Sequence, residues 1–224
     1  MNNINKFINS KPFQDYMKIN PSSSAEIESF LFDFYKRYKV ISGIEDLLKT
    51  LADNTQGKNP PEFKWFNYFS QIRCTNYLLL NKIPIRSFEV QIGGRKLDFQ
   101  LADGRLGEIK SFSTSRNSIK DPWTLDESVI SEFVEKKIKP SFDNQKAHLL
   151  IIDDIFAFDT KPYRHLGYFL SFVNRPEIKD RHNLILKHLK KFLPKMLYLS
   201  FVNSITINPE IKYLGIEFKK LRLK

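Results

Sequence analysis

The sequence predicts a mixed α/β or α+β core with a helical N-terminal extension and a mixed C-terminal extension. The middle of the chain gives the order helix, strand, strand, strand, helix, strand, which is typical of a sheet flanked by helices. The run "AHLLIIDDIFAF" is apolar over the length of a strand, as central buried strands are. With 42% hydrophobic and 14% aromatic residues, the chain also has enough apolar side chains for a core.

These observations divide the 224 residues into three predicted parts. Residues 1–60 are expected to form an N-terminal arm and helices. Residues 61–160 form the core, and residues 161–224 form a basic helix and strands that pack on this core.

The first part predicts an arm followed by two helices. Residues 1–20 are expected to be mobile or loosely docked. The stretch "PSSSAEIESFLFDFYKRYKVI" has Ser23 and Glu26 at the spacing of a capping box, followed by apolar residues at helical spacing. "GIEDLLKTLAD" predicts a second helix, and "NTQGKNPPE" is a break rich in turn-forming residues.

The core elements follow from hydrophobic periodicity. The stretch "FKWFNYFSQIRCTNYLLLNK" predicts a long amphipathic helix over 63–81, and "RSFEVQIGG" alternates as a strand does. A hairpin follows in "RKLDFQLADGRLGEIKSF", then a polar loop in "SFSTSRNSIKDPWTL" and a helix over 126–139. The predicted strands lie near 88–93, 96–102, 106–111 and 148–153.

The C-terminal part predicts an irregular stretch over 161–182 and then a basic amphipathic helix, "RHNLILKHLKKFL". Lys190 and Lys191 in this helix could lie along a nucleic-acid backbone, whereas many surface helices use lysine only for solubility. "KMLYLSFV" and "KYLGIEFKKL" predict two late strands.

The charge of the chain favours a polyanionic partner. The formal net charge is +11, which suits nucleic acid or an anionic membrane surface. The first residues lack the apolar centre of a signal peptide, and no apolar run is long enough to span a bilayer. We therefore expect a cytoplasmic protein without a membrane partner. Its single cysteine, Cys74, excludes an intrachain disulfide and fits a reducing compartment.

The hairpin carries charged residues that packing alone does not require. Asp98 lies on the polar face of the first strand, and Glu108 and Lys110 share one face of the second. A two-residue turn would pair Asp98 with Ile109 and separate the charges. An odd-numbered loop or a bulge would pair Asp98 with Lys110 and Gln100 with Glu108, and all three charged groups would then share one face.

A face with two carboxylates and an ammonium suits phosphodiester chemistry. Neighbouring carboxylates repel each other and lose solvation unless a cation lies between them. Oxygen ligands at this spacing suit Mg²⁺ or Mn²⁺, which bind through one or two carboxylates and keep several waters. Such a cation lowers the pKa of a bound water, and an adjacent lysine can stabilise the transition state.

Asp98 followed by Glu108-Ile109-Lys110 resembles the motif of the PD-(D/E)-x-K nucleases, which are restriction-endonuclease-like enzymes. The resemblance covers residues 61 to 155 and implies a restriction-endonuclease-like mixed central sheet flanked by helices. It implies that Asp98, Glu108 and the carbonyl of Ile109 bind the metal and that Lys110 serves in catalysis. It also favours DNA over RNA as the substrate.

The chain departs from this family's pattern in two places. Leu97 stands where the family has proline, which is a common variation. Gln71 stands on the upstream helix where many members have glutamate, and glutamine can bind a metal-bound water without supplying charge. Glu62 lies too near the start of that helix to replace it, whereas Glu89 is an alternative helper. One metal ion and two metal ions both remain compatible with the sequence.

Other charged residues have both functional and ordinary interpretations. Lys136 and Lys137 lie where the family often contacts phosphate, but they also fit a solvated helix face. Asp153 and Asp154 could approach a ligand or serve in a turn. The histidines do not have metal-ligand spacing; they are His148, His165, His182 and His188.

Three functions follow from this sequence. The first is a Mg²⁺- or Mn²⁺-dependent endonuclease with Asp98, Glu108, Lys110 and Gln71 in its active site. The second is a catalytically inactive nucleic-acid-binding or assembly subunit on the same fold, and Gln71 favours it. The third is a basic adaptor unrelated to nucleases. A homodimer or a partner subunit is compatible with each of them.

Overall fold

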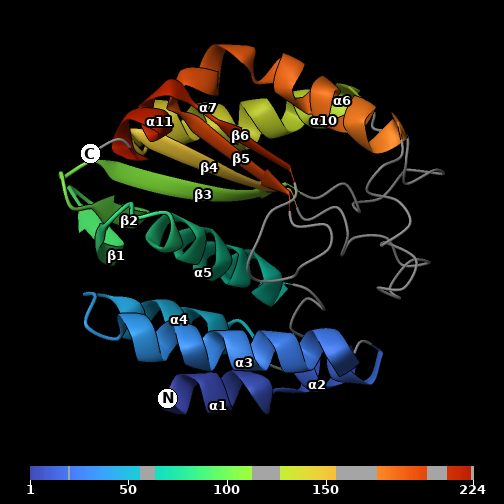
Figure 1. Ribbon diagram of the computed structural model, residues 1–224, viewed down its shortest axis with the longest axis vertical. Helices are drawn as coiled ribbons and strands as arrows, with labels where there is room; N and C mark the ends of the chain where they lie inside the picture. Colours follow the sequence, from blue (N-terminus) through green and yellow to red (C-terminus); the bar gives the residue numbers. More distant parts are fainter. Residues whose placement is uncertain (20, 56–63, 113–126, 155–175, 201–210, 223–224) are drawn as a thin grey trace. The chain divides into compact units, whose positions relative to one another are not determined.

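The computed structural model describes residues 1–19, 21–55, 64–112, 127–154, 176–200 and 211–222. The chain forms two compact units. Unit 1 comprises Met1–Gly107 with residues 205–207, and unit 2 comprises Glu108–Ser204 with residues 208–224. The expected mixed class is confirmed, because helices flank a six-stranded sheet with the strand order β1-β2-β3-β4-β5-β6 (Figure 1).

The N-terminal residues of unit 1 are helical, so the expectation of a loosely docked arm is wrong. Ile4, Phe7 and Phe13 are fully buried, and burying each such side chain contributes about 1.5 to 3 kcal/mol. The helices of unit 1 are α1 (Asn2–Ile8), α2 (Lys11–Ile19), α3 (Pro21–Tyr38), α4 (Ile44–Asp53) and α5 (Lys64–Leu80).

An aromatic cluster around Trp65 of α5 holds the first two helices in place. The ring centroids of Phe7, Phe13 and Tyr16 lie 5.3, 5.8 and 5.5 Å from that of Trp65, and each ring meets the indole edge to face. Aromatic pairs at this spacing contribute about 0.5 to 1.5 kcal/mol beyond the area they bury. The N-terminal helices are therefore part of the core of unit 1.

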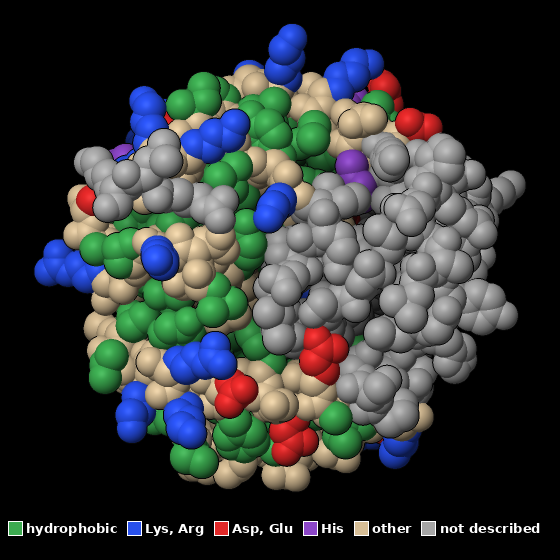
Figure 2. All heavy atoms as spheres, viewed as in Figure 1, with side chains coloured by type: hydrophobic (Ala, Val, Ile, Leu, Met, Phe, Trp, Pro, Cys, Tyr) green, Lys and Arg blue, Asp and Glu red, His purple; other side chains and the backbone are tan. Residues whose placement is uncertain are grey.

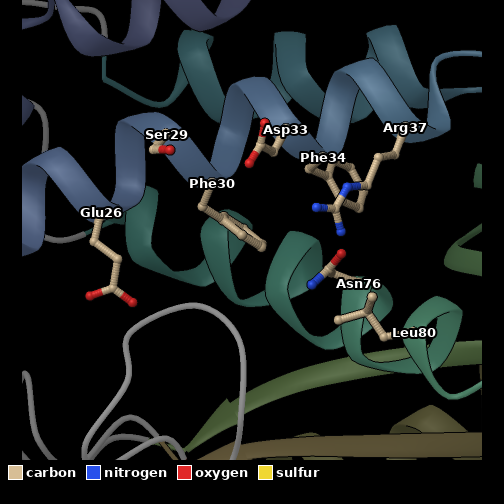
Figure 3. Close-up of a pocket in the computed structure, with 8 residues that line it drawn as sticks. All are labelled: Glu26, Ser29, Phe30, Asp33, Phe34, Arg37, Asn76 and Leu80. Carbon is tan, nitrogen blue, oxygen red and sulfur yellow. The ribbon is translucent and has the colours of Figure 1, made fainter.

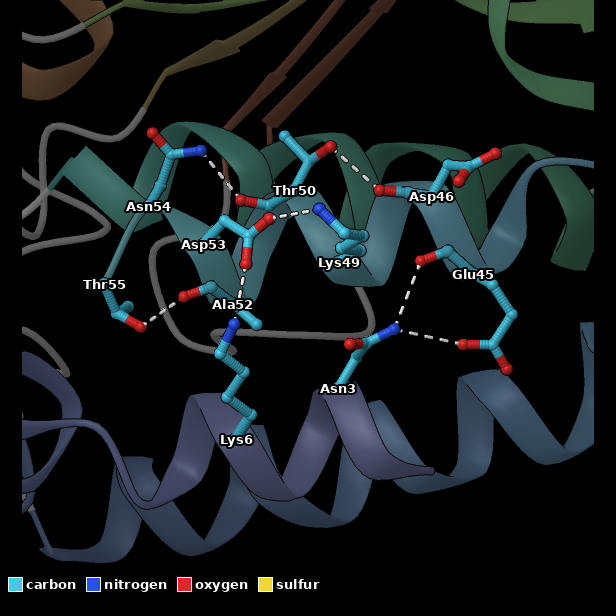
Figure 4. A network of polar contacts seen from close by, with 10 residues as sticks. All are labelled: Asn3, Lys6, Glu45, Asp46, Lys49, Thr50, Ala52, Asp53, Asn54 and Thr55. Atoms are coloured by element: carbon cyan, nitrogen blue, oxygen red, sulfur yellow. Dashed lines mark hydrogen bonds and ion pairs between the residues drawn. The ribbon is translucent and has the colours of Figure 1, made fainter.

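Polar contacts also join α1 to α4 (Figure 4). The ammonium of Lys6 lies 2.8 Å from the carboxylate of Asp53, which Lys49 of the same helix approaches to 2.6 Å. The amide of Asn3 donates to the carboxylate of Glu45 at 3.2 Å. These exposed contacts fix the orientation of α1, and such pairs contribute little stability by themselves.

The hairpin strands of unit 1 are β1 (Ile85–Ile92) and β2 (Arg95–Leu101), which pair antiparallel. Phe88 pairs with Phe99, and Val90 pairs with Leu97. Glu89 of β1 therefore lies opposite Asp98 of β2.

The register between β2 and β3 (Leu106–Phe112) differs from the expected one by two residues. Gln100 pairs with Leu106, where we expected it to pair with Glu108. The backbone N–H of Leu101 donates to the carbonyl of Arg105 at 2.8 Å, so an odd-numbered loop connects the strands. Gly104 in this loop has a φ of 89°, a left-handed conformation that glycine adopts without strain. A shift of two residues leaves the side-chain parity of the strands unchanged.

A close contact between a ring and a glycine fixes this register. Phe99 pairs with Gly107 across β2 and β3. A Cβ atom at Gly107 would lie 1.9 Å from the ring of Phe99, which means that the ring occupies the space above the glycine. Any other residue at this position would displace the ring.

In unit 2 the sheet continues with β4 (Leu149–Asp154), β5 (Met196–Ser200) and β6 (Ile211–Leu214). β4 and β5 are parallel and every residue in them is buried, as expected for central strands, whereas β6 is antiparallel to β5. The helical elements of this unit are α6 (Glu127–Phe133), the π-helix η1 (Val134–Ile138), α7 (Lys139–Asp143), α10 (Pro176–His188), the 3₁₀ helix η3 (Lys190–Lys195) and α11 (Ile216–Arg222).

The core of unit 2 lies between the sheet and the helices α6, η1 and α10 (Figure 1). Alternate residues of the strands supply one side of it, and residues at helical spacing supply the other. Its buried members are Phe112, Ile130, Val134, Ile138, Leu150, Ile152, Ile185, Leu189, Met196 and Tyr198.

Three C-terminal predictions need correction. Residues 176–182, expected to be irregular, belong to α10, and this helix ends at His188. Lys190 and Lys191 are therefore on the 3₁₀ helix η3. The expected last strand is a strand only over Ile211–Leu214, after which α11 begins. The predicted polar loop beyond Phe112 and the irregular stretch over 161–175 lie outside the described residues.

Within the described ranges, no helix combines the length and the apolar character needed to cross a membrane.

Candidate functional site

The predicted site residues fall on both units. Gln71 and Asp98 belong to unit 1, whereas Glu108, Ile109 and Lys110 belong to unit 2, because the division follows Gly107.

In unit 1, α5 and β2 bring Gln71 and Asp98 together. The amide Nε2 of Gln71 donates to Oδ1 of Asp98 at 2.7 Å. The other end of the amide, Oε1 of Gln71, is buried and accepts no hydrogen bond from the described residues. A buried acceptor without a donor is unusual in a folded protein, and it is an available ligand for a cation or a water. The predicted helper on the upstream helix therefore contacts the predicted metal ligand.

Glu89 joins this polar group from β1. Its φ is 51°, a left-handed conformation that is strained for residues other than glycine. Its side chain is only 6% exposed and forms an ion pair with Lys96, whose side chain is 55% exposed. The hydrogen bond to Glu89 raises the pKa of Lys96, and the negative charges of Glu89 and Asp98 add to the effect while burial opposes it. Lys96 is therefore within electrostatic reach of both carboxylates.

In unit 2, β3 holds a buried carboxylate next to an ammonium. Glu108 is 4% exposed, and Nζ of Lys110 donates to its Oε1. The second oxygen of Glu108, Oε2, is buried, and no donor in the part of the chain that the structure describes reaches it. Ile109 points to the opposite face of the strand, and its side chain is buried in the core. The alternation of β3 thus separates the apolar residue from the two charged ones, as the sequence predicted.

The predicted nucleic-acid-binding lysines are all exposed, but they differ in their partners. Lys136 lies 2.6 Å from Glu132 one helical turn away, whereas no ion pair is found for Lys137 within the described residues. Lys190 and Lys191 extend from η3 into solvent, with the ammonium of Lys191 5.0 Å from the ring centroid of Phe192. Lys and Arg side chains are dispersed over the described part of the face in Figure 2. The positive charge of this face is therefore not concentrated in one patch.

A further buried polar group at the end of β4 was not recognised as a group from the sequence. The hydroxyl of Tyr198 donates to Oδ2 of Asp154 at 2.6 Å, and Nε2 of His182 lies 3.4 Å from the same oxygen. Asp153 beside it is fully buried. The three residues come from separate elements, so their spacing in the sequence carried no signal.

Unit 1 also has an open pocket of about 190 Å³ between α3 and α5 (Figure 3). Phe30 and Phe34 give it an apolar wall, and the side chains of Arg37 and Asn76 point toward each other at one end. None of the predicted site residues lines it. Its residues are Glu26, Ser29, Phe30, Asp33, Phe34, Arg37, Asn76 and Leu80.

The donor set of the predicted site suits a hard cation. Within the described residues, no group of three or more His, Cys, Asp or Glu side chains is arranged to hold a metal ion. A site of one or two carboxylates completed by amide oxygens and waters is the kind that Mg²⁺ prefers. Within the described residues, Oε1 of Gln71 in unit 1 and Oε2 of Glu108 in unit 2 accept no hydrogen bond, and each is an oxygen of the type that such an ion accepts.

None of the family models, curated proteins or solved structures compared with this chain matches it.

Proposed function

We propose that this protein is a Mg²⁺- or Mn²⁺-dependent nuclease with a restriction-endonuclease-like core, and that it cleaves DNA as an endonuclease. The observation that carries the proposal is the buried carboxylate of Glu108, which has Lys110 on one oxygen and, among the described residues, no hydrogen-bond donor on the other. A buried carboxylate oxygen without a donor is costly in a strand that only needs to pack. A cation bound there would remove this cost.

The chemistry assigns a separate role to each residue. Asp98 and Glu108 would hold the cation, and the backbone carbonyl of Ile109 would complete the protein ligands. When bound, the cation lowers the pKa of a water and neutralises charge on the phosphoryl oxygens. The ammonium of Lys110 orients that water or stabilises charge in the transition state. Gln71 orients the carboxylate of Asp98 through its hydrogen bond.

The hairpin supports this assignment through its parity. Gln100 pairs with Leu106, so these two residues face the same side of the sheet. Asp98 is two residues from Gln100 along β2, and Glu108 is two residues from Leu106 along β3. Within each strand, alternation puts Asp98 on the face of Gln100 and Glu108 on the face of Leu106, as it would in the expected register.

Cleavage assays test the proposal directly. Supercoiled DNA, linear DNA, single strands and RNA are incubated with the protein and Mg²⁺, Mn²⁺ or a chelator. We expect metal-dependent cleavage of DNA that Asp98→Ala, Glu108→Ala and Lys110→Ala each reduce by at least about a hundredfold. The first two variants lose a charged metal ligand, and the third loses the ammonium that would stabilise the transition state. Asp143→Ala, which removes an exposed carboxylate from unit 2, is the matched control and should cleave normally. Cleavage by Asp98→Ala at the parent rate would exclude the metal-nuclease mechanism.

A catalytically inactive nucleic-acid-binding subunit is the second candidate. The presence of Gln71 at a position where a carboxylate would add charge favours it. Under this alternative, the parent binds DNA but does not cleave it with either metal. Gln71→Glu would then be the informative variant, because a gain of cleavage would identify the missing charge as the cause.

A further inference from the structure

We propose that Glu89 is a cation ligand of unit 1, and that it acts with Asp98 and the amide oxygen of Gln71 while Lys96 competes with the cation for the two carboxylates. The inference deepens the proposed function and rests on it, because it concerns the same cation and adds a ligand from a neighbouring strand. All four residues belong to unit 1.

Glu89 has an unfavourable backbone conformation. A left-handed φ of 51° in the middle of a strand is strained for a residue with a Cβ. Glycine would adopt this conformation without strain. The strand has glutamate here, and its side chain is 6% exposed. Backbone preference therefore does not account for a glutamate at this position.

Glu89 and Asp98 lie opposite each other on β1 and β2, because the neighbouring pairs on both sides are in register. Like charges directly opposite each other destabilise an antiparallel pair, and burial of Glu89 increases the effect. A positive charge is required to offset this repulsion.

Lys96 supplies the positive charge that offsets this repulsion. It pairs with Glu89 and lies on the same face of β2 as Asp98, two residues away. Its side chain is 55% exposed, so the ammonium can leave for solvent at little cost. A divalent cation carries twice the charge of the ammonium and accepts more oxygen ligands. Lys96 therefore competes for this position, but a cation can displace it.

Gln71 supplies an uncharged oxygen. Its Nε2 donates to Asp98, and no donor among the described residues reaches its buried Oε1. An amide oxygen is an uncharged ligand for Mg²⁺ or Mn²⁺. Two carboxylates and this amide oxygen, completed by waters, would make a hard-cation site in which Glu89 supplies the charge that Gln71 lacks.

Mn²⁺ binding measured by calorimetry tests the inference without reference to cleavage. Glu89→Gln and Asp98→Asn should each weaken Mn²⁺ binding at least tenfold, because each removes a charged ligand. Lys96→Met should tighten binding severalfold, because it removes the competing ammonium. Glu45→Gln, which removes a carboxylate from α4 of the same unit, should bind as the parent does.

Glu89→Gly separates a ligand role from a structural one. Glycine accepts the φ at this position, so the variant should melt at or above the temperature of Glu89→Gln and still bind Mn²⁺ at least tenfold more weakly than the parent. Parent-like Mn²⁺ binding by both position-89 variants would overturn the inference. Weaker binding by Lys96→Met would also overturn it, because it would make the ammonium a support for the site.

The inference and the proposed function fail in different ways. Loss of Mn²⁺ binding in Glu89→Gln, together with no cleavage by any variant or by the parent, would support the ligand role and contradict the nuclease. Metal-dependent cleavage that needs Asp98, with Mn²⁺ bound equally well by parent and Glu89→Gln, would contradict the ligand role and leave the nuclease in place.

Discussion

Glu108 and Lys110 show how a single pair of residues links stability to the proposed chemistry. The Glu108 side chain is 5% exposed and that of Lys110 is 22% exposed, so the carboxylate has lost most of its water and the ammonium has kept some. Pairs of this kind add little net stability while both partners are present. Removal of one partner leaves the other charge buried and uncompensated.

Lys110→Met should therefore lower the free energy of unfolding by about 1 to 3 kcal/mol. This loss is smaller than for a fully buried pair, because the ammonium of Lys110 is partly exposed. Glu108→Gln in the same chain should recover most of the loss, because the uncompensated charge is then absent. Urea unfolding of the parent, both single variants and the double variant measures the coupling. Additive effects would show that the pair does not interact.

Asp53 gives the docking of α1 a pH dependence. Hydrogen bonds from Lys49 and then Lys6 hold the pKa of Asp53 below its usual value. Since the folded value is the lower one, the contribution is complete above the unfolded pKa of about 4 and is lost as the pH falls through the folded pKa. NMR shifts of α1 should report weaker docking only in this acidic range. Asp53→Asn should remove the acid transition, and its persistence there would exclude Asp53 as the cause.

At the scale of elements, the hairpin was predictable in its strands but not in its exact register. Alternation of apolar and polar residues determines which side chains of β2 and β3 are buried. The sequence predicts this alternation, and the structure has it. The choice among odd-numbered loops depends on where Gly104 turns the chain and on the fit of Phe99 over Gly107. Such contacts between strands have no signature in the periodicity of either strand.

Gly107→Ala tests the importance of that fit. The added methyl would overlap the ring of Phe99, so we expect a loss of about 1 to 3 kcal/mol in the free energy of unfolding. Combining it with Phe99→Leu should restore part of the loss by opening space. Gly107 does not have a left-handed φ, so backbone strain of that kind does not contribute to this loss. A loss that Phe99→Leu leaves unchanged would mean that the ring contact is unimportant.

The helices that the sequence did not predict are short and depend on distant partners. α1 and α2 have polar stretches typical of mobile termini, and they are ordered by contacts with Trp65, far away in the chain. α11 follows a four-residue strand directly, and the stretch that contains both has apolar residues compatible with either structure. In the site, neither the hydrogen bond from Gln71 to Asp98 nor the left-handed φ of Glu89 has a signal in the sequence.

At the scale of the whole molecule, the net charge of +11 makes salt dependence the natural probe of nucleic-acid binding. If Lys190 and Lys191 contact phosphates, replacing both with Gln should reduce the slope of log affinity against log salt by up to about 2 and weaken binding to all sequences alike. Lys36→Gln with Lys39→Gln removes the same charge from exposed positions in unit 1 and is the control. Equal slopes for the two double variants would assign the effect to net charge alone.

The enclosure of Trp65 by the first two helices also makes unit 1 optically observable. The chain has two tryptophans, so replacing Trp123 with Phe would leave Trp65 as the single indole emitter. With its ring fully shielded from water, Trp65 should fluoresce at short wavelength, and detachment of α1 or α2 should shift the emission to the red. Stopped-flow fluorescence would then time the departure of the N-terminal helices separately from the circular dichroism of the whole chain.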